Sequence, residues 1–173
     1  QIRDLRGNVG TRLKKLDAGD YDAIVLASAG LSRLGLESRI LYRFTSKEIL
    51  PAGGQGAVGV ECRFADKKTL AFLQCLHDSE TAYQVIAERS LNKALNGGCQ
   101  APIASFAEFN SATGELYLRG MVGDVEGIRI LLAEGQTTRE DAEDLGRSVA
   151  KKLLDQGAQK LLDQVNSKNK ASS

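Results

Sequence analysis

The stretch SETAYQVIAERSLNKALNGGCQAPIASF, residues 79–106, passes from a helical pattern to a strand pattern and decides the fold of the second half of the chain. Its first part is amphipathic with the helical period, so we expect a helix over residues 79–95. Ser79 is a suitable N-cap, and Gly97 suits the position just past the helix end. The residues that we expect to face inward are Ala82, Val85, Ile86 and Leu95.

A cysteine stands at the corner between this helix and the strand pattern. Cys99 follows Gly97 and Gly98, whereas a structural cysteine usually lies on the apolar face of a helix or strand. The single histidine of the chain, His77, argues against a Cys–His nucleophile pair. The residues leave two readings of Cys99 open: an incidental loop thiol, or the anchor of a permanent covalent attachment.

Three strand patterns follow this corner. PIASFAEFN, GELYLRGMVG and IRILLAEG each alternate or cluster apolar residues between turn signals, over residues 102–110, 114–123 and 128–135. With the helix before them and a helix after them, the order is helix, strand, strand, strand, helix. That order predicts an antiparallel sheet with its helices on one face.

The chain after the third strand predicts a long helix and a tail. Thr137 and Glu140 have the spacing of a capping box ahead of a helix that reaches about Gln156. Gly157 interrupts this helix, and one or two further helical turns follow it. Residues 166–173 contain almost no large apolar residues, so we expect them to be disordered.

The first fifty residues have a different pattern. Residues 8–19 predict a helix capped by Asn8 and ended by Gly19, with Val9, Leu13 and Leu16 on one face. DAIVLA, residues 22–27, is a continuous apolar run of the kind that forms a strand covered on both faces of a parallel sheet. A short helix should start at residue 28, at the strand end where ligands bind in open α/β sheets.

A glycine-rich segment separates these patterns. Pro51, Gly53, Gly54 and Gly56 indicate a crossover between domains. Residues 57–62 then resemble a strand, and residues 67–76 predict a short helix. GGQGA, residues 53–57, lacks the GKS/T end of a P-loop and the GxGxxG spacing. It is either a flexible hinge or a place where backbone and the Gln55 amide approach a ligand or another domain.

Composition excludes several classes of protein. The 173 residues are 42% hydrophobic and 26% charged, which is typical of a globular protein, and the net charge of +1 gives no overall field toward nucleic acid or membrane. No apolar run approaches the length of a membrane span. The three cysteines are an odd number without CxxC spacing, which argues against a disulfide framework and against a thiolate zinc site. Cysteines without a disulfide framework favour a cytoplasmic location. We therefore expect no metal site.

Arginines mark a candidate anion site. Arg6 and Arg12 flank the helix start capped by Asn8, and Arg33 follows the apolar run at residues 22–27. Free N–H groups at a helix start attract anions, and guanidinium groups bind carboxylates bidentately. These residues are either an ordinary cap with solvated arginines or a site for a polyanionic small molecule.

Three separated segments carry a resemblance to a known family. LRGNVGTRLKKLDAGDYDAIVLASAGLSRLGL, LPAGGQGAVGVECR and AERSLNKALNGGCQAPI resemble the porphobilinogen deaminases, also called hydroxymethylbilane synthases, in the right order and over nearly the whole chain. The departures are mild: Gly53 stands where PAVGQGA has valine, and QAPIASF stands for QVPIGAY. Neither departure touches a charged group.

The resemblance implies an activity and roles for individual residues. Enzymes of this family are transferases of heme and chlorophyll biosynthesis that join four porphobilinogen units head to tail, with loss of ammonia, on a thioether-linked dipyrromethane cofactor. It implies Cys99 as the covalent attachment point and the carboxylates of the substrate and growing polypyrrole chain as ligands of the arginines. The implied cofactor-binding residues are Arg6, Gly7, Asn8, Arg12, Gln55 and Gly56; Arg6, Arg12 and Arg33 bind substrate, and Arg89 has an orienting role.

The resemblance also implies how the chain is organised. Residues 1–50 correspond to part of a second, periplasmic-binding-protein-like α/β domain, residues 51–76 to a crossover belonging to the first domain, and residues 77–173 to a C-terminal α+β domain that attaches the cofactor. The family's catalytic aspartate is expected upstream of Gln1, so we expect the missing N-terminal half as a partner, no activity from this chain alone, and a monomer when complete. The alternative from the residues themselves is a non-catalytic anion-binding module of the same fold.

Overall fold

The computed structural model describes residues 1–97, 101–124 and 126–171, with side chains up to residue 165. The chain divides into two compact units, Gln1–Thr45 and the residues from Ser46 onward. Each unit is described by itself.

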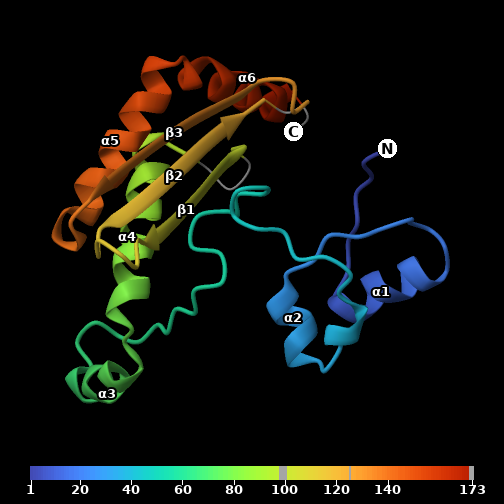
Figure 1. Ribbon diagram of the computed structural model, residues 1–173, viewed down its shortest axis with the longest axis horizontal. Coiled ribbons are helices and arrows are strands. Elements are labelled where there is room, and N and C mark those ends of the chain that lie inside the picture. The colour runs from blue at the N-terminus through green and yellow to red at the C-terminus, as the bar shows by residue number, and fades with distance from the viewer. Residues whose placement is uncertain (98–100, 125, 172–173) are drawn as a thin grey trace. The chain divides into compact units, whose positions relative to one another are not determined.

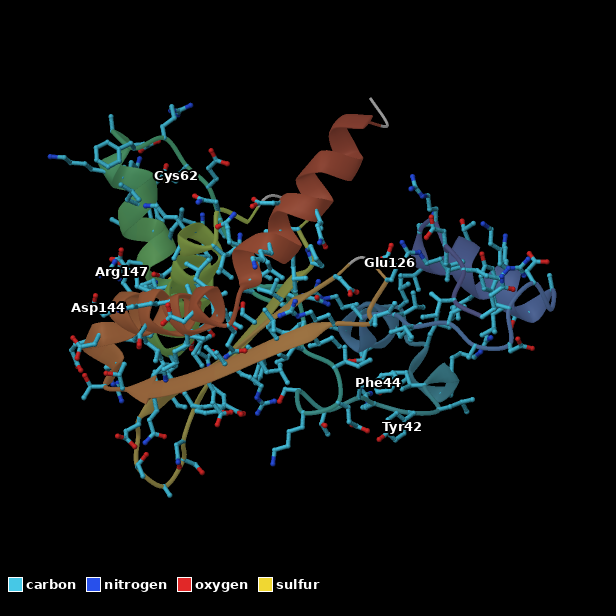
Figure 2. The ribbon with its side chains drawn as sticks, turned by 90° about the horizontal axis from the view of Figure 1, so that it is seen from above. Tyr42, Phe44, Cys62, Glu126, Asp144 and Arg147 are labelled. Carbon is cyan, nitrogen blue, oxygen red and sulfur yellow. The ribbon has the colours of Figure 1, made fainter. Side chains whose placement is uncertain are left out.

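The first unit is helical. Helix α1 (Val9–Asp17), helix α2 (Ser28–Arg33) and a short 3-10 turn (Glu37–Arg39) are its regular elements. Asn8 caps α1, because its Oδ1 accepts a hydrogen bond from the Thr11 N–H at 2.8 Å. The predicted capping residue and the predicted position of the helix are therefore confirmed. The rings of Tyr42 and Phe44 meet edge to face, with centroids 5.1 Å apart (Figure 2).

Two strands predicted from apolar runs are not formed. Residues 22–27 and 57–62 form no strand and pair with no described strand. Val25 is 67% exposed, and Val58 and Val60 are 77% and 58% exposed. The reason is physical: a strand of a parallel sheet is stabilised by backbone partners on its edges and by cover on its faces. Neither run has such neighbours among the described residues.

The second unit is an α+β sandwich of one sheet and its helices. The sheet has the order β1-β2-β3, and both pairings are antiparallel (Figure 1). Helices α4 and α5 cover one face of it, and α3 lies at the far end of α4. This confirms the predicted three-stranded sheet with helices on one face. The elements are α3 (Lys67–Leu73), α4 (Ser79–Ala94), β1 (Ile103–Phe109), β2 (Leu116–Gly123), β3 (Ile130–Thr137), α5 (Ala142–Asp155) and α6 (Ala158–Ala171), with 3-10 turns at Gln74–Leu76 and Arg139–Asp141.

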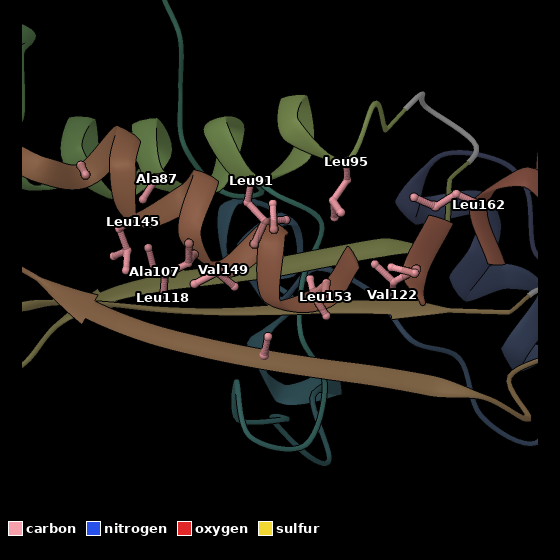
Figure 3. Close-up of a cluster of buried hydrophobic side chains, with 14 of the residues drawn as sticks. Ala87, Leu91, Leu95, Ala107, Leu118, Val122, Leu145, Val149, Leu153 and Leu162 are labelled. Carbon is pink, nitrogen blue, oxygen red and sulfur yellow. The ribbon is translucent and has the colours of Figure 1, made fainter. Parts of the chain in front are cut away.

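The hydrophobic core lies between the sheet and these helices. Ala87 and Leu91 of α4 and its C-cap residue Leu95 recur every four residues and are fully buried in the core with β2 and α5 (Figure 3). The predicted inward face of this helix was partly wrong, because Ile86 is 44% exposed and Leu91 is the central contact. The other core residues include Leu116, Leu118, Val122, Leu145, Val149 and Leu153.

The helix ends also differ from the sequence prediction. Asp78, not Ser79, caps α4 by accepting a hydrogen bond from the Thr81 N–H at 2.7 Å. Asn96, with φ +51°, takes the left-handed position that was assigned to Gly97. The predicted capping box of Thr137 and Glu140 is not formed, since Thr137 ends β3. Helix α6 extends to Ala171, into the segment predicted to be disordered, because its first turns pack on the core.

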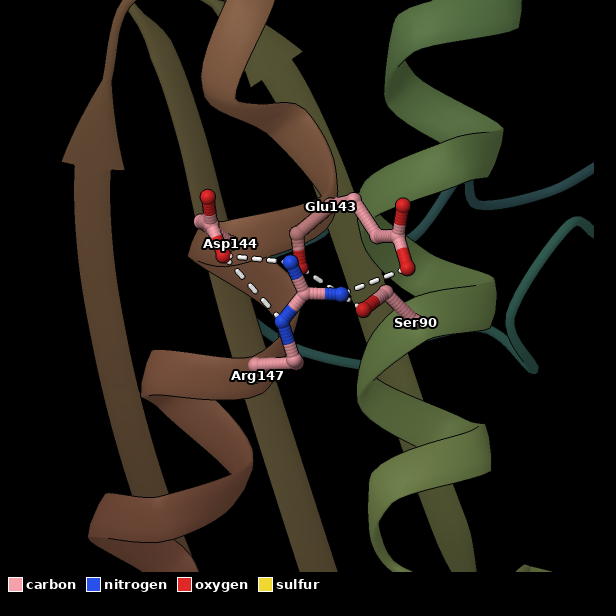
Figure 4. A network of polar contacts seen from close by, with 4 residues as sticks. All are labelled: Ser90, Glu143, Asp144 and Arg147. Atoms are coloured by element: carbon pink, nitrogen blue, oxygen red, sulfur yellow. Dashed lines mark hydrogen bonds and ion pairs between the residues drawn. The ribbon is translucent and has the colours of Figure 1, made fainter.

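Helices α4 and α5 approach each other closely at Gly146. A Cβ atom on Gly146 would lie 2.6 Å from Ser90 Cβ and 2.8 Å from Leu91 N, distances that allow no side chain. The Ser90 hydroxyl donates to the Glu143 carbonyl at 2.7 Å and joins the same two helices (Figure 4). On the solvent side, the Arg147 guanidinium pairs with the Glu143 and Asp144 carboxylates of its own helix.

We expect Gly146→Ala to destabilise the protein by about 1–3 kcal/mol. Alanine is a better helix former than glycine, but its methyl group would collide with α4 backbone, so the helices would have to separate. Urea denaturation measures the change. Ser148→Ala, at an exposed position of the same helix, is the control and should change little. A variant at position 146 as stable as the control would contradict the close approach.

Candidate functional site

The start of α1 holds the first group of predicted site residues. Gly7 has a φ of +122°, which turns the chain so that its carbonyl accepts a hydrogen bond from Arg12 Nε at 2.8 Å. This hydrogen bond fixes Arg12 beside the helix start through its Nε atom. The two terminal nitrogens of the guanidinium group take no part in the bond. The first N–H groups of a helix have no partner within it, and the helix dipole adds positive potential there. Gly7, Asn8 and Arg12 thus form one local, electropositive arrangement.

Two further predicted arginines lie in the same unit. Arg6 and Arg33 are exposed, and no described residue accepts a hydrogen bond from either side chain. Helix α2, which ends at Arg33, lies against the start of α1: a Cβ atom on Gly30 would be 3.7 Å from Val9 Cγ2. The fold therefore brings the helix that carries Arg33 next to the helix start that carries Arg6 and Arg12.

The predicted glycine loop, residues 53–57, lies in the second unit and, with Ala52 before it, forms the loop of residues 52–57. Two hydrogen bonds between Ala52 and Gln55 hold the conformation of the loop. The Gln55 N–H donates to the Ala52 carbonyl at 3.0 Å, and the Ala52 N–H donates to Gln55 Oε1 at 3.2 Å. Gly54 and Gly56 have φ values of +77° and +91°, so side chains would be strained at both positions. A Cβ atom on either would meet open space. The loop therefore exposes its backbone, and the Gln55 oxygen is partly engaged within it.

One residue of this region was missed by the sequence analysis. Glu88 of α4 is only 6% exposed, and its carboxylate bridges two segments. One oxygen accepts from the Gly54 N–H at 2.6 Å, and the other accepts from the Ala107 N–H of β1 at 2.7 Å. The available signal was position: Glu88 directly follows Ala87 on the buried side of the helix, where an acid is unusual.

The environment of Glu88 disfavours its charge. Burial raises the pKa of Glu88, although the hydrogen bonds from the Gly54 and Ala107 N–H groups act in the opposite direction. Because desolvation prevails, the folded protein holds a proton at this site more readily than the unfolded chain does. The ionised carboxylate is therefore retained at a cost in stability.

Arg89 and the glycine loop share a cavity. A hollow of about 750 Å³ in the second unit is lined by Gly53 and Gly54, by Val58, and by α4 residues that include Val85 and Arg89. Arg89 is exposed at this wall. The structure thus brings Arg89 and the loop together. Cys99, the predicted attachment residue, lies outside the described residues.

Comparison with protein families identifies the chain. Residues 1–71 match the family model described as "Porphobilinogen deaminase, dipyromethane cofactor binding domain". Residues 82–155 match the one described as "Porphobilinogen deaminase, C-terminal domain". The chain belongs to the porphobilinogen deaminase family. Members of this family are hydroxymethylbilane synthases, transferases of tetrapyrrole biosynthesis that act on porphobilinogen and carry a dipyrromethane cofactor.

Two other properties of this porphobilinogen deaminase family member follow from the described residues. Within residues 1–97, 101–124 and 126–171, every helix is too short or too polar to cross a bilayer. In the same part of the chain, no group of three or more His, Cys, Asp and Glu side chains is arranged to hold a metal ion.

The raised pKa of Glu88 predicts how pH changes stability. Between the ordinary pKa of a glutamate and the higher folded value, the folded state binds more protons than the unfolded state. The free energy of unfolding of the wild type, minus that of Glu88→Gln, should therefore decrease as pH rises through this interval and be constant above it. Urea denaturation of both proteins between about pH 4 and about pH 8 measures this difference. A difference that increases with pH would contradict the assignment.

Proposed function

We propose that this chain holds dipyrromethane and the growing polypyrrole through Cys99, through the arginines at the helix starts of the first unit, and through the glycine loop of the second. The observation that carries the proposal is the arrangement at α1, where Gly7 and Asn8 shape the helix start and Arg12 is fixed beside it. Arg6 and Arg33 add exposed guanidinium groups with no described acceptor.

The residues present fit such a ligand chemically. Each pyrrole unit carries an acetate and a propionate, so the chain of units is strongly anionic. Guanidinium groups and helix-start N–H groups are the donors that carboxylates prefer. Among the described residues, no carboxylate forms an ion pair with Arg6, Arg12 or Arg33. These side chains are therefore available for an acidic ligand.

The reaction explains why these donors matter. Porphobilinogen loses ammonia from its aminomethyl carbon, and that carbon then forms a bond to a pyrrole carbon of the preceding unit, which gives up a proton. The bound dipyrromethane supplies the primer for this chemistry. Arg6, Arg12 and Arg33 would hold the carboxylates in place while each new bond forms, so their contribution is to binding and orientation. Arg89 would orient the chain from the wall of the cavity beside the loop.

Cys99 is proposed as the attachment residue because, in the sequence, it follows α4 and two glycines. Small neighbours of this kind would leave room for two pyrrole rings to extend from its sulfur. Cys62 and Cys75 are free thiols in other settings; Cys75 is exposed, and its Sγ donates to the Phe72 carbonyl at 3.0 Å (Figure 2 labels Cys62). A reduced thiol is required for the attachment, and we accordingly place the reaction in the cytoplasm.

We further propose the domain assignment that the resemblance implies. Residues 1–50 would belong to the second domain of the family, residues 51–76 to the first, and residues 77–173 to the C-terminal domain. The exposed valines of residues 57–62 support this assignment, since an exposed apolar segment is stabilised by joining a sheet. The partner would be the remainder of the enzyme, with the complete protein monomeric.

In the complete enzyme, we expect Cys99→Ser to abolish attachment of dipyrromethane. A hydroxyl is a much weaker nucleophile than a thiol near neutral pH. Intact-mass measurement after incubation with porphobilinogen detects the adduct of two pyrrole units. Cys62→Ser and Cys75→Ser are the matched controls and should keep the adduct. An adduct on the Cys99→Ser protein would exclude this residue as the anchor.

We expect each of Arg6→Leu, Arg12→Leu and Arg33→Leu to weaken porphobilinogen binding roughly ten- to a hundredfold, because a hydrogen bond to a charged group contributes ~1.5–3 kcal/mol. Calorimetric titration with porphobilinogen measures the affinity. Arg43→Leu, an exposed arginine of the same unit, is the control and should bind normally. Unchanged affinity in all three variants would refute the carboxylate site.

A further inference from the structure

The outer edge of strand β1 is completed by groups that are not a strand. On one side β1 pairs with β2. On the other side, the Ser105 N–H donates to the Pro51 carbonyl at 3.0 Å, and the Ala107 N–H donates to Glu88 Oε1 at 2.7 Å. An exposed strand edge with free N–H groups tends to pair with other chains. Here a loop carbonyl and a side-chain carboxylate satisfy that edge.

The same carboxylate connects the edge to the glycine loop. Glu88 Oε2 accepts from the Gly54 N–H at 2.6 Å, so one oxygen bonds the strand and the other bonds the loop. The carboxylate thus occupies the place that a peptide group of a neighbouring strand would take. Short bonds of this kind to an ionised acceptor are stronger than bonds between neutral groups.

The loop lies so close to this edge that it has no room for a side chain at residue 53. A Cβ atom on Gly53 would be 2.8 Å from Ser105 Oγ and 3.7 Å from Glu88 Cβ. The Ser105 hydroxyl is buried and has no described hydrogen-bond partner. Direct packing on β1 and two hydrogen bonds, at Pro51 and Gly54, therefore fix the first half of the loop.

We propose that Glu88 is a positioning residue, whose carboxylate holds the loop of residues 52–57 in the conformation that presents Gln55 and Gly56 to the polypyrrole. This inference rests on the proposed function of the loop. An apolar side chain at residue 88 would be buried without any cost of burying charge. The carboxylate holds Gly54 in position relative to β1, which an apolar side chain would not do.

Amide hydrogen exchange tests the loop contact directly on the 173-residue chain. In Glu88→Gln, whichever way the side-chain amide turns, one of the two N–H groups faces an NH₂ group and loses its acceptor. The Gly54 or Ala107 amide should then exchange roughly ten- to a hundredfold faster, and in Glu88→Ala both should do so. The core amides of Leu118 and Leu153 report global stability and should change much less.

Ser105→Ala is the matched control for this measurement. It removes a buried hydroxyl beside the loop but leaves the backbone bond from Ser105 N to the Pro51 carbonyl, so Gly54 should remain protected. Equal acceleration of the Gly54 amide and the core amides in Glu88→Gln would overturn the positioning role, because it would show a general loss of stability. An unchanged Gly54 amide together with an unchanged Ala107 amide would overturn the contact itself.

Porphobilinogen titration then links the contact to function. We expect Gln55→Ala and Glu88→Gln each to weaken porphobilinogen binding about tenfold, and the double variant to be no weaker than the worse single variant, because both act through one loop. If Gln55→Ala weakens binding and Glu88→Gln does not, the positioning role is overturned and the loop site stands. If Gln55→Ala binds normally, the loop site is overturned, whatever the exchange data show about Glu88.

Discussion

The close packing of α4 against both β2 and α5 is the constraint on which the second unit depends. Leu91 lies over Gly120, where a Cβ atom would be only 2.5 Å from Leu91 Cδ1, and the backbone of α4 meets α5 at Gly146. Glycines at these two positions let a helix lie directly on a strand and on a second helix. Packing at this density leaves α4 little freedom to rotate or slide.

A fixed α4 orients every functional element that it carries. Successive residues of a helix point about 100° apart, so Glu88 reaches the loop and β1, Arg89 faces the cavity, and Leu91 enters the core. The helix ends at Ala94, and Asn96 just beyond it has a left-handed conformation, three residues before Cys99 in the sequence. A change in the rotation of α4 would displace all of these groups together.

The sequence predicted the parts of the structure that depend on local patterns. The cap at Asn8, the three strands and the covering helices were readable because they follow from side-chain spacing and turn residues. The strands at residues 22–27 and 57–62 were not formed, because a strand needs neighbours that no local pattern supplies. Glu88 was missed for a related reason: its partners, Gly54 and Ala107, are distant in sequence, and only the tertiary fold brings them to one carboxylate.

The contact between Gly53 and Ser105 ties together two positions that are far apart along the chain. Both are sites at which this sequence departs from the motifs it resembles: glycine stands where PAVGQGA has valine, and serine stands where QVPIGAY has alanine. One change removes bulk and the other adds it at the same point of contact. The two positions are therefore coupled, since restoring valine alone would place a branched side chain against the serine hydroxyl. Lineages would cross from one combination to the other through the Gly–Ala intermediate, which is loosely packed, and avoid the Val–Ser intermediate, which is overpacked.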